Sequence, residues 1–428
     1  MTYSQKGSEM MKKLFILILS MLCLVALAAC QTNESTGDGE GEKDILTVWV
    51  MGSDEYWRTY HDNLIAEYME NNENVQVDVE YVPWSQGENQ LVNAAANQQM
   101  PDVSTIAGRW TAQLASMGAI ESLDAYFEES YPDAFVEAAW QTTQYQDQTW
   151  GIPVGFTTTG LFYRQDWLTD AGFEAPPATW EEFEAVAEAF TEDDRYGFGL
   201  VGTNNMETTM FWAPFLWTNG GKFLSDDLTE ARFNQPEGVE ALEFYVRLFQ
   251  EGWAPEGSIS NDRGDSRTLF LTGAVGMTTQ GPWLPKFIRD EAPDMDYGIA
   301  PYPQNKVPAN LGTADHIVMS ANANNKPLAW DFIDFFTNEE NDLKWAEFQG
   351  FIPYRKANLE QTDMKDDPDF AVFFDVAHEA ISYPTLPEWP QIDQAIAEAM
   401  QQALMGTKTP QQALDEAAEK VNDLLAEE

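Results

Sequence analysis

Hydrophobic and polar positions follow a regular order in the part of the chain that begins near residue 45. The run Ile45–Val50 is rich in β-branched and aromatic residues and predicts a buried strand, whereas the alternation in Val75–Val82 predicts a strand with one polar face. Trp57–Met69 spaces apolar residues at helical intervals, Leu91–Gln98 is an Ala-, Asn- and Gln-rich helix, and Pro101-Asp102-Val103 begins a third strand. This alternation of strands and helices predicts parallel pairing and an α/β fold.

The later part of the chain continues to mix helices with other segments. Thr179 precedes Glu182 by three residues, the spacing of a capping box at a helix start. Two segments, Glu237–Glu251 and Pro327–Phe336, have the pattern of amphipathic helices. Thr409-Pro410 places proline in a first helical turn and opens the last helix.

The first residues have the pattern of a secretory signal peptide, which we assign to residues 1–29. Lys12-Lys13 supply the positive region, Leu14–Ala28 the apolar stretch, and Leu27-Ala28-Ala29-Cys30 resembles a lipobox. This resemblance implies cleavage before Cys30, a lipid on its sulfur and an extracytoplasmic protein anchored to the membrane; the alternative is plain secretion. Residues 30–44 would then be the lipidated cysteine and a polar, flexible tether.

Composition narrows the possible partners. The 428 residues carry 71 Asp and Glu against 23 Lys and Arg, a formal net charge of −48, which repels phosphate backbones and excludes nucleic acid. An acidic surface suits a saline or alkaline habitat, and the alternative is attraction of a cationic solute such as a polyamine. Both cysteines, Cys23 and Cys30, precede the mature fold, so no disulfide is expected.

Motifs of catalysis are absent from the sequence. There is no GxSxG, Walker loop or GxGxxG, and the three histidines stand in no metal-ligand spacing. Acidic residues abound, so a secreted glycosidase stays an alternative that no single pair of carboxylates can support. We therefore expect no enzyme activity, no metal and no cofactor.

Several motifs in order resemble the sugar-binding group of extracellular solute-binding proteins of ABC importers, the group that includes maltose-binding proteins. The resemblance spans nearly all of the chain from Ile45 to the final helix. Two positions depart from the family pattern, Thr313–His316 in place of paired glycines and Arg164 in place of Asn. The motifs that carry the resemblance are Leu46–Trp49, Pro101–Val103, Gly118–Leu123, Trp150–Pro153, Leu161–Arg164, Thr179–Phe183, Phe270–Met277, Gly281–Trp283, Trp330–Phe336 and Gly350–Pro353.

The resemblance implies a two-lobed, periplasmic-binding-protein-like α/β fold with a hinge and a ligand cleft between the lobes. Lobe one would comprise residues 45–151 and 316–345, and lobe two residues 152–315 and 346–428. The chain would cross between lobes near Ile152–Phe156 and Asn310–Asp315. The implied function is capture of a sugar or oligosaccharide by a monomer that delivers it to the permease subunits of an ABC importer.

Aromatic rings cover the C–H face of a sugar while polar groups bond its hydroxyls, so tryptophans and nearby polar residues are the candidate ligands. Trp283 follows Gly281-Pro282, a turn that would present the indole, although a core position is the alternative. Arg109-Trp110 follows the third strand and Trp84 the second, at the edge where open α/β sheets place ligand residues; a surface pair is the alternative for Arg109-Trp110.

Three further candidates carry stronger alternatives. Trp212 lies in a Phe/Trp/Pro cluster that suits a core equally well. Trp389 lies between two prolines ahead of a helix and matches a family cleft position, with a structural role as the alternative. Asp315 matches a family contact position, with a solvated turn as the alternative.

Overall fold

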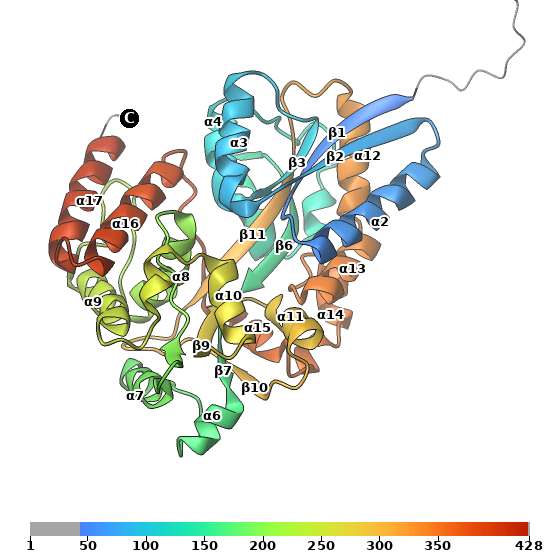
Figure 1. Ribbon diagram of the computed structural model, residues 1–428. Coiled ribbons are helices and arrows are strands. Elements are labelled where there is room, and N and C mark those ends of the chain that lie inside the picture. Colours follow the sequence, from blue (N-terminus) through green and yellow to red (C-terminus); the bar gives the residue numbers. More distant parts are fainter. Residues whose placement is uncertain (1–42, 427–428) are drawn as a thin grey trace, which may run out of the picture. The chain divides into compact units, whose positions relative to one another are not determined.

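Two separate β-sheets organise the protein, and the computed structural model describes residues 43–426 (Figure 1). The first sheet contains β1 (Asp44–Met51), β2 (Val75–Val82), β3 (Val103–Ala107), β6 (Ile152–Thr158), β11 (Asn310–Met319) and β12 (Ala380–Ile381). The second sheet has the order β10-β7-β9-β8, from β7 (Gly160–Arg164), β8 (Tyr196–Phe198), β9 (Val275–Gln280) and β10 (Tyr297–Ala300). Within residues 43–426, no helix combines the length and apolar character needed to cross a bilayer.

The predicted α/β unit at the start of the fold is confirmed. β1 pairs in parallel with both β2 and β3, and α2 (Glu55–Asn71) and α3 (Trp84–Ala96) connect these strands. The sequence pattern placed the start of α3 at Leu91, whereas the helix begins at Trp84. Its first two turns are rich in polar residues, so apolar spacing alone did not reveal them.

β6 and β11 link the two sheets, because β6 is followed directly by β7 and β11 follows β10. They pair with each other antiparallel, and β11 also pairs antiparallel with β3. The β6–β11 register shifts between Asp315 and His316, so that Asp315 lies opposite Gly155 and His316 opposite Pro153. This irregularity turns the local backbone at one of the predicted ligand residues.

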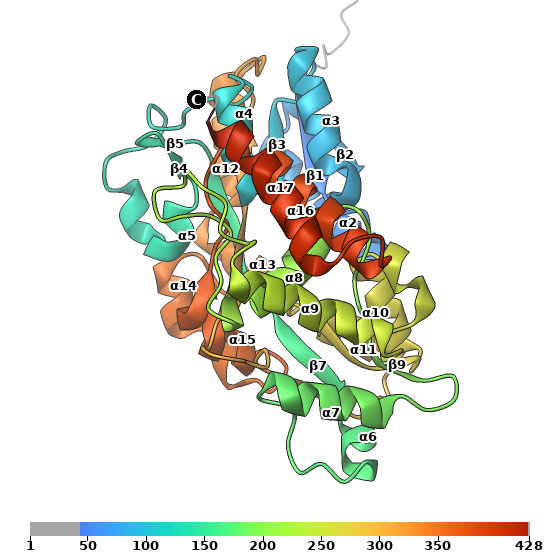
Figure 2. The ribbon, with the colours of Figure 1, turned by 90° about the vertical axis from the view of Figure 1, so that its left-hand side faces the viewer.

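Helices cover both sheets. The capping boxes at Thr179 and Thr409 are both present, at the starts of α7 (Trp180–Phe190) and α17 (Pro410–Leu425). The C-terminal pair α16 (Trp389–Leu404) and α17 packs on α8 (Met206–Thr218) and α9 (Pro236–Gln250), as Figure 2 shows. The other helices of eight or more residues are α10 (Arg263–Leu271), α11 (Leu284–Glu291), α12 (Lys326–Phe336) and α13 (Glu339–Gln349).

The predicted lobe boundaries fall at β6 and within β11. Near the third predicted boundary, after residue 345, Ile352 and Tyr354 pack in the hydrophobic core of the first sheet together with Val154 and Phe156. Ile352 and Tyr354 therefore pack with the first sheet, and the division into lobes stays a prediction.

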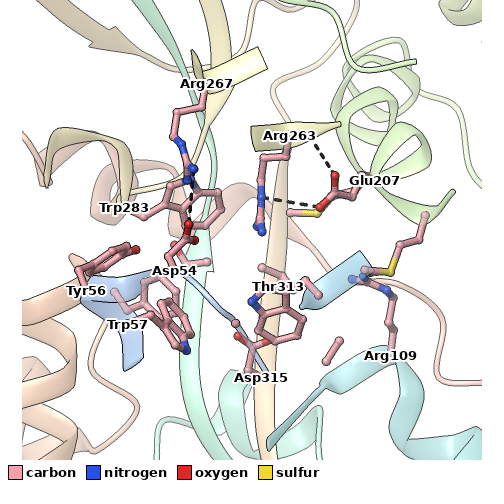
Figure 3. Close-up of a pocket in the computed structure, with 17 residues that line it drawn as sticks. Asp54, Tyr56, Trp57, Arg109, Glu207, Arg263, Arg267, Trp283, Thr313 and Asp315 are labelled. Atoms are coloured by element: carbon pink, nitrogen blue, oxygen red, sulfur yellow. Dashed lines mark hydrogen bonds and ion pairs between the residues drawn. The ribbon is translucent and has the colours of Figure 1, made fainter. Parts of the chain in front are cut away.

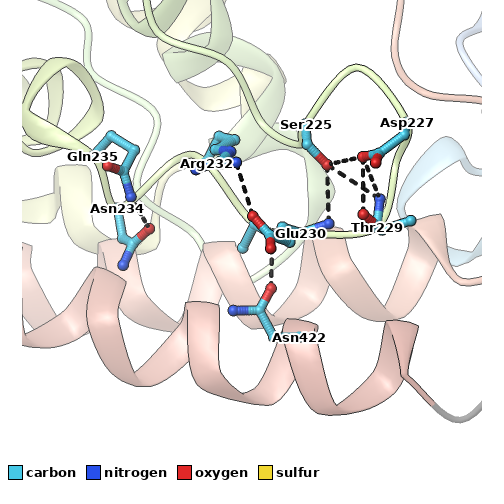
Figure 4. Close-up of polar contacts among 9 residues, drawn as sticks. Ser225, Asp227, Thr229, Glu230, Arg232, Asn234, Gln235 and Asn422 are labelled. Carbon is cyan, nitrogen blue, oxygen red and sulfur yellow. Dashed lines mark hydrogen bonds and ion pairs between the residues drawn. The ribbon is translucent and has the colours of Figure 1, made fainter.

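A long surface loop is tied to the C-terminal helix by polar contacts (Figure 4). Ser225 donates to Asp227 through its hydroxyl at 2.6 Å, and the same Asp227 oxygen accepts the hydroxyl of Thr229 at 2.8 Å. The backbone amide of Ala231 donates to Oδ1 of Asn422 on α17 at 2.7 Å. The bond from Ala231 satisfies a backbone amide of the loop and fixes the loop against α17.

Asp102 explains one of the sequence motifs, because its buried carboxylate joins three segments of the first sheet. Oδ2 accepts the backbone amide of Thr47 at 2.9 Å and its hydroxyl at 2.7 Å. Oδ1 accepts the backbone amide of Asn324 at 2.8 Å and its side-chain amide at 3.2 Å. One buried carboxylate therefore satisfies donors on β1 and on the loop that follows β11.

Replacing Asp102 by Ala should destabilise the fold, because it leaves these donors without an acceptor. We expect the free energy of unfolding to fall by roughly 2–4 kcal/mol, measured by denaturant titration. Asp78→Ala, at an exposed position of β2, is the matched control and should change stability little. Equal effects of the two substitutions would contradict this role of Asp102.

Candidate functional site

A pocket lies among elements of both sheets and holds about 750 Å³ of space not filled by atoms, part of it open to solvent (Figure 3). Its lining combines aromatic rings with charged side chains and two threonines, Thr157 of β6 and Thr313 of β11. The linking strands thus form part of the pocket wall.

The first sheet contributes residues that follow the ends of its parallel strands. Asp54 follows β1, Trp84 follows β2, and Arg109 follows β3. The carboxyl ends of parallel strands meet at one edge of a sheet, which is where such folds place ligand residues. Tyr56 and Trp57, in the first turn of α2, extend this side of the pocket.

Two tryptophans in the pocket wall lie directly against glycines. Gly52 has φ +106°, and a Cβ there would lie 2.6 Å from Nε1 of Trp57. A Cβ on Gly281 would overlap the ring of Trp283. Trp283 is also held by its indole N–H, which donates to Oε1 of Gln280 at 2.9 Å. Both indoles therefore depend on a missing side chain for their positions.

Three arginines and three acids also line the pocket. Arg263 lies 3.8 Å from Glu207, and its guanidinium carbon lies 5.0 Å from the ring centre of Trp283. Arg267 lies 3.8 Å from Asp54. The side chains of Arg263 and Arg267 extend from α10 into the pocket, as Figure 3 shows, and Arg109 lies across from them.

Asp315 lies on β11 where the β6–β11 register shifts. Burial raises the pKa of its carboxyl from 3.8 to about 7, although the cationic Arg109 and Arg263 act in the opposite direction. Near neutral pH this carboxyl is therefore partly protonated and able both to donate and to accept a hydrogen bond. Within residues 43–426, His, Cys, Asp and Glu form no group arranged to hold a metal ion.

Four of the predicted site residues come together in this pocket, namely Trp283, Trp84, Arg109 and Asp315. These four residues are spread over 232 positions of the sequence (from 84 to 315, counting both ends), and the folded chain brings them to one pocket. Their contact with a ligand stays a prediction. The predicted lipidation site, Cys30, lies outside the described residues.

The other three predicted tryptophans lie outside this pocket, fully buried in hydrophobic cores. Trp110 packs beneath the first sheet among residues that include Leu91, Trp212 lies in the interior of α8, and Trp389 packs against the rings of Phe223 and Tyr383. Burial of a large indole surface stabilises the fold, and this is the core alternative that their sequence context left open. A ligand-binding role for them stays a prediction.

Sequence reasoning missed several residues of the pocket, and some of them carried a usable signal. Asp54 follows the first strand just as Arg109 follows the third, so the strand-end argument extends to it. Arg263 and Arg267 are four residues apart, on one helix face, in a chain where acids outnumber bases 71 to 23. Glu207 had no such signal, since it is one acid among many.

Comparison with known proteins agrees with this architecture. The sequence profile of bacterial extracellular solute-binding proteins matches residues 58–342. A binding protein of Brucella abortus (strain 2308) is 28% identical over 370 residues, covering 86% of this chain and 90% of that protein. The maltotriose-binding protein of Pyrococcus abyssi (strain GE5 / Orsay) is 25% identical over 349 residues, covering 79% and 74%.

A solved structure shows the same fold. It is an ABC transporter solute-binding protein of Thermotoga lettingae TMO bound with α-D-tagatose, with a TM-score of 0.83, 28% identity, and coverage of 90% of this chain and 100% of that one. The predicted two-lobed, periplasmic-binding-protein-like fold is thereby confirmed.

The raised pKa of Asp315 predicts a pH-dependent stability. The unfolded chain loses this proton near pH 3.8 and the folded chain near pH 7, so the free energy of unfolding should fall as pH rises between these values. The asparagine in the Asp315→Asn variant cannot ionise, so its free energy of unfolding should not show this fall with rising pH. Its melting temperature should exceed that of the unaltered protein at pH 8, and the difference should shrink at pH 4. A difference that does not vary with pH would refute the assignment.

Proposed function

The chain belongs to the bacterial extracellular solute-binding proteins, and we propose that it captures a sugar or oligosaccharide and delivers it to an ABC importer. The observation that carries this proposal is the composition of the pocket. The rings of Trp57, Trp84 and Trp283 supply apolar faces, while charged and hydroxyl side chains supply hydrogen-bonding groups around them. The related proteins named for maltotriose and bound to tagatose support a sugar.

Capture requires the pocket walls to close on the solute. Arg263, Arg267 and Trp283 belong to elements around the second sheet, while Asp54 and Arg109 follow strands of the first. A solute that touches both sets of residues stabilises the arrangement in which they are close, which shifts the population toward the closed form. β6 and β11, which join the two sheets, are the proposed hinge.

The alternatives from the sequence fit the pocket less well. A polyamine would be repelled by Arg109, Arg263 and Arg267, since a cationic solute needs carboxylates and aromatic faces free of competing cations. A glycosidase is disfavoured by the family, which is one of extracellular solute-binding proteins. Sugar capture is therefore the stronger proposal.

We also propose that the protein is a lipoprotein held at the outer face of the membrane. The apolar stretch that ends in Leu27-Ala28-Ala29-Cys30 supports cleavage before Cys30 and attachment of lipid to its sulfur. Acyl chains contribute about 0.8 kcal/mol of membrane affinity per buried methylene. A monomer anchored in this way would meet the permease subunits of the importer at the same surface.

A thermal-shift screen of the purified protein against sugars, oligosaccharides and polyamines tests the proposed function. Ligand at 100 times its dissociation constant adds about 2.7 kcal/mol of stability, enough to raise the melting temperature measurably. We expect a response to one class of sugars. A response to polyamines alone would overturn the proposal.

Trp283→Ala should weaken binding of the sugar found in that screen. Loss of the indole removes an apolar face from the pocket, and we expect at least a tenfold rise in the dissociation constant, about 1.4 kcal/mol, measured by calorimetry. Trp330→Ala is the matched control, because Trp330 packs with Tyr126 and Phe127 away from the pocket. Unchanged affinity in the Trp283 variant would remove this residue from the site.

Cys30→Ser should abolish membrane anchoring, since serine offers no thiol for the lipid. We expect the variant in the soluble fraction of the cell envelope or in the medium, and no incorporation of labelled fatty acid. Retention of the variant in the membrane fraction, with label, would show that the anchor lies elsewhere.

A further inference from the structure

Three arginines line one pocket of a strongly acidic protein. Arg109 follows β3, and Arg263 and Arg267 lie on α10. The whole chain has 23 Lys and Arg against 71 Asp and Glu. From this composition alone, three arginines in one pocket would not be expected. Some local role must offset the cost of holding these cations together in a partly buried space.

The contacts of these arginines leave most of their donors free for a ligand. Arg263 and Arg267 approach carboxylates only as 3.8 Å ion pairs, which is beyond hydrogen-bond distance. Arg109 directs Nη2 at the sulfur of Met206, and its Nε is buried without a hydrogen-bond partner. An unpaired buried guanidinium nitrogen is costly, so a missing acceptor is indicated.

Most arginines elsewhere in the described chain behave differently. They donate hydrogen bonds to oxygens close by: Arg164 to Asp166, Arg195 to Glu192, Arg232 to Glu230, Arg247 to Glu184, and Arg289 to Asp369. In such an acidic protein, acceptors are plentiful for arginines on the surface. The pocket arginines therefore stand out because they lack acceptors where the ligand would lie.

The acids of the pocket do not supply this acceptor. Glu207 is buried and its Oε2 accepts the backbone amide of Arg263 at 2.9 Å, so this carboxylate is engaged at the start of α10. Asp54 is about half exposed and is shared with solvent. Burial raises the pKa of Asp315, which lowers its negative charge near neutral pH. The pocket thus has more positive than negative charge to offer a solute.

We propose that the solute is an acidic sugar, in which a carboxylate or phosphate oxyanion is bound by Arg263, Arg267 and Arg109. This inference rests on the proposed function, because it takes the same pocket as the solute site. A guanidinium fork matches two oxygens of an oxyanion, and charge-assisted bonds of this kind are roughly twice as strong as neutral ones. The hydroxylated ring would lie against Trp283, beside the guanidinium of Arg263.

Calorimetry with matched pairs of sugars tests the inference. The probes are D-galactose with D-galacturonate and D-glucose with D-glucuronate, together with D-glucose 6-phosphate. We expect the charged member of a pair to bind at least tenfold more tightly than the neutral one. Comparing the uronates with D-glucose 6-phosphate shows whether the site prefers a carboxylate or a phosphate.

Variants of the arginines identify the groups responsible. Arg263→Gln should weaken binding of the charged sugar at least tenfold more than it weakens binding of the neutral partner, and Arg263→Lys should restore part of the loss, because it keeps charge without the fork. Arg267→Gln is the second variant, and thermal unfolding checks that each one folds. Arg247→Gln is the matched control, because Arg247 is bonded to Glu184 outside the pocket.

The outcomes separate this inference from the proposed function. Neutral sugars that bind as tightly as their acids would overturn the inference and leave sugar capture standing. The inference would also fail if Arg263→Gln and Arg267→Gln weakened neutral and charged sugars equally. If no sugar of either kind bound, the proposed function would fail together with it.

Discussion

The antiparallel pairing of β6 with β11 is the constraint on which the pocket depends. These strands belong to the first sheet, β6 runs directly into β7 of the second, and β11 follows β10 after a loop, so one ladder of backbone hydrogen bonds holds both connections together. Thr157, Thr313 and Asp315 lie on this ladder and line the pocket. The register shift occurs at Asp315, whose carboxyl lies within electrostatic reach of Arg109 and Arg263.

Charge is the second organising element, and it works differently in the pocket and on the surface. The excess of acids repels itself at long range, but salt screens charges more than about 8–10 Å apart, so the pocket responds mainly to its own neighbours. There, burial works against ionisation of Asp315 while two arginines favour it. The balance makes the pocket less negative than the surface of the protein.

Backbone space decides where the aromatic walls stand. Gly52 and Gly281 leave room that the indoles of Trp57 and Trp283 fill. Any side chain at either glycine would overlap the neighbouring indole. Trp283 is held further by Gln280, whose side chain amide donates to the carbonyl of Arg263 at 3.2 Å. Aromatic and cationic parts of the pocket are thereby coupled through one glutamine.

The sequence by itself determined the local elements and the kind of protein. Strand alternation at Val75–Val82 and the capping boxes at Thr179 and Thr409 depend on near neighbours in the chain, which periodicity and side-chain chemistry reveal. The strand-end rule likewise led to Arg109 and Trp84.

Only the tertiary structure decided which tryptophans line a pocket and which fill a core. Trp283 and Trp389 both stand beside prolines at helix starts and both are buried, yet Trp283 also lines the pocket whereas Trp389 does not. The difference comes from what distant segments place against each ring: Arg263 and Phe351 around the first, Phe223 around the second. Burial is a property of such long-range packing, and local sequence does not encode it.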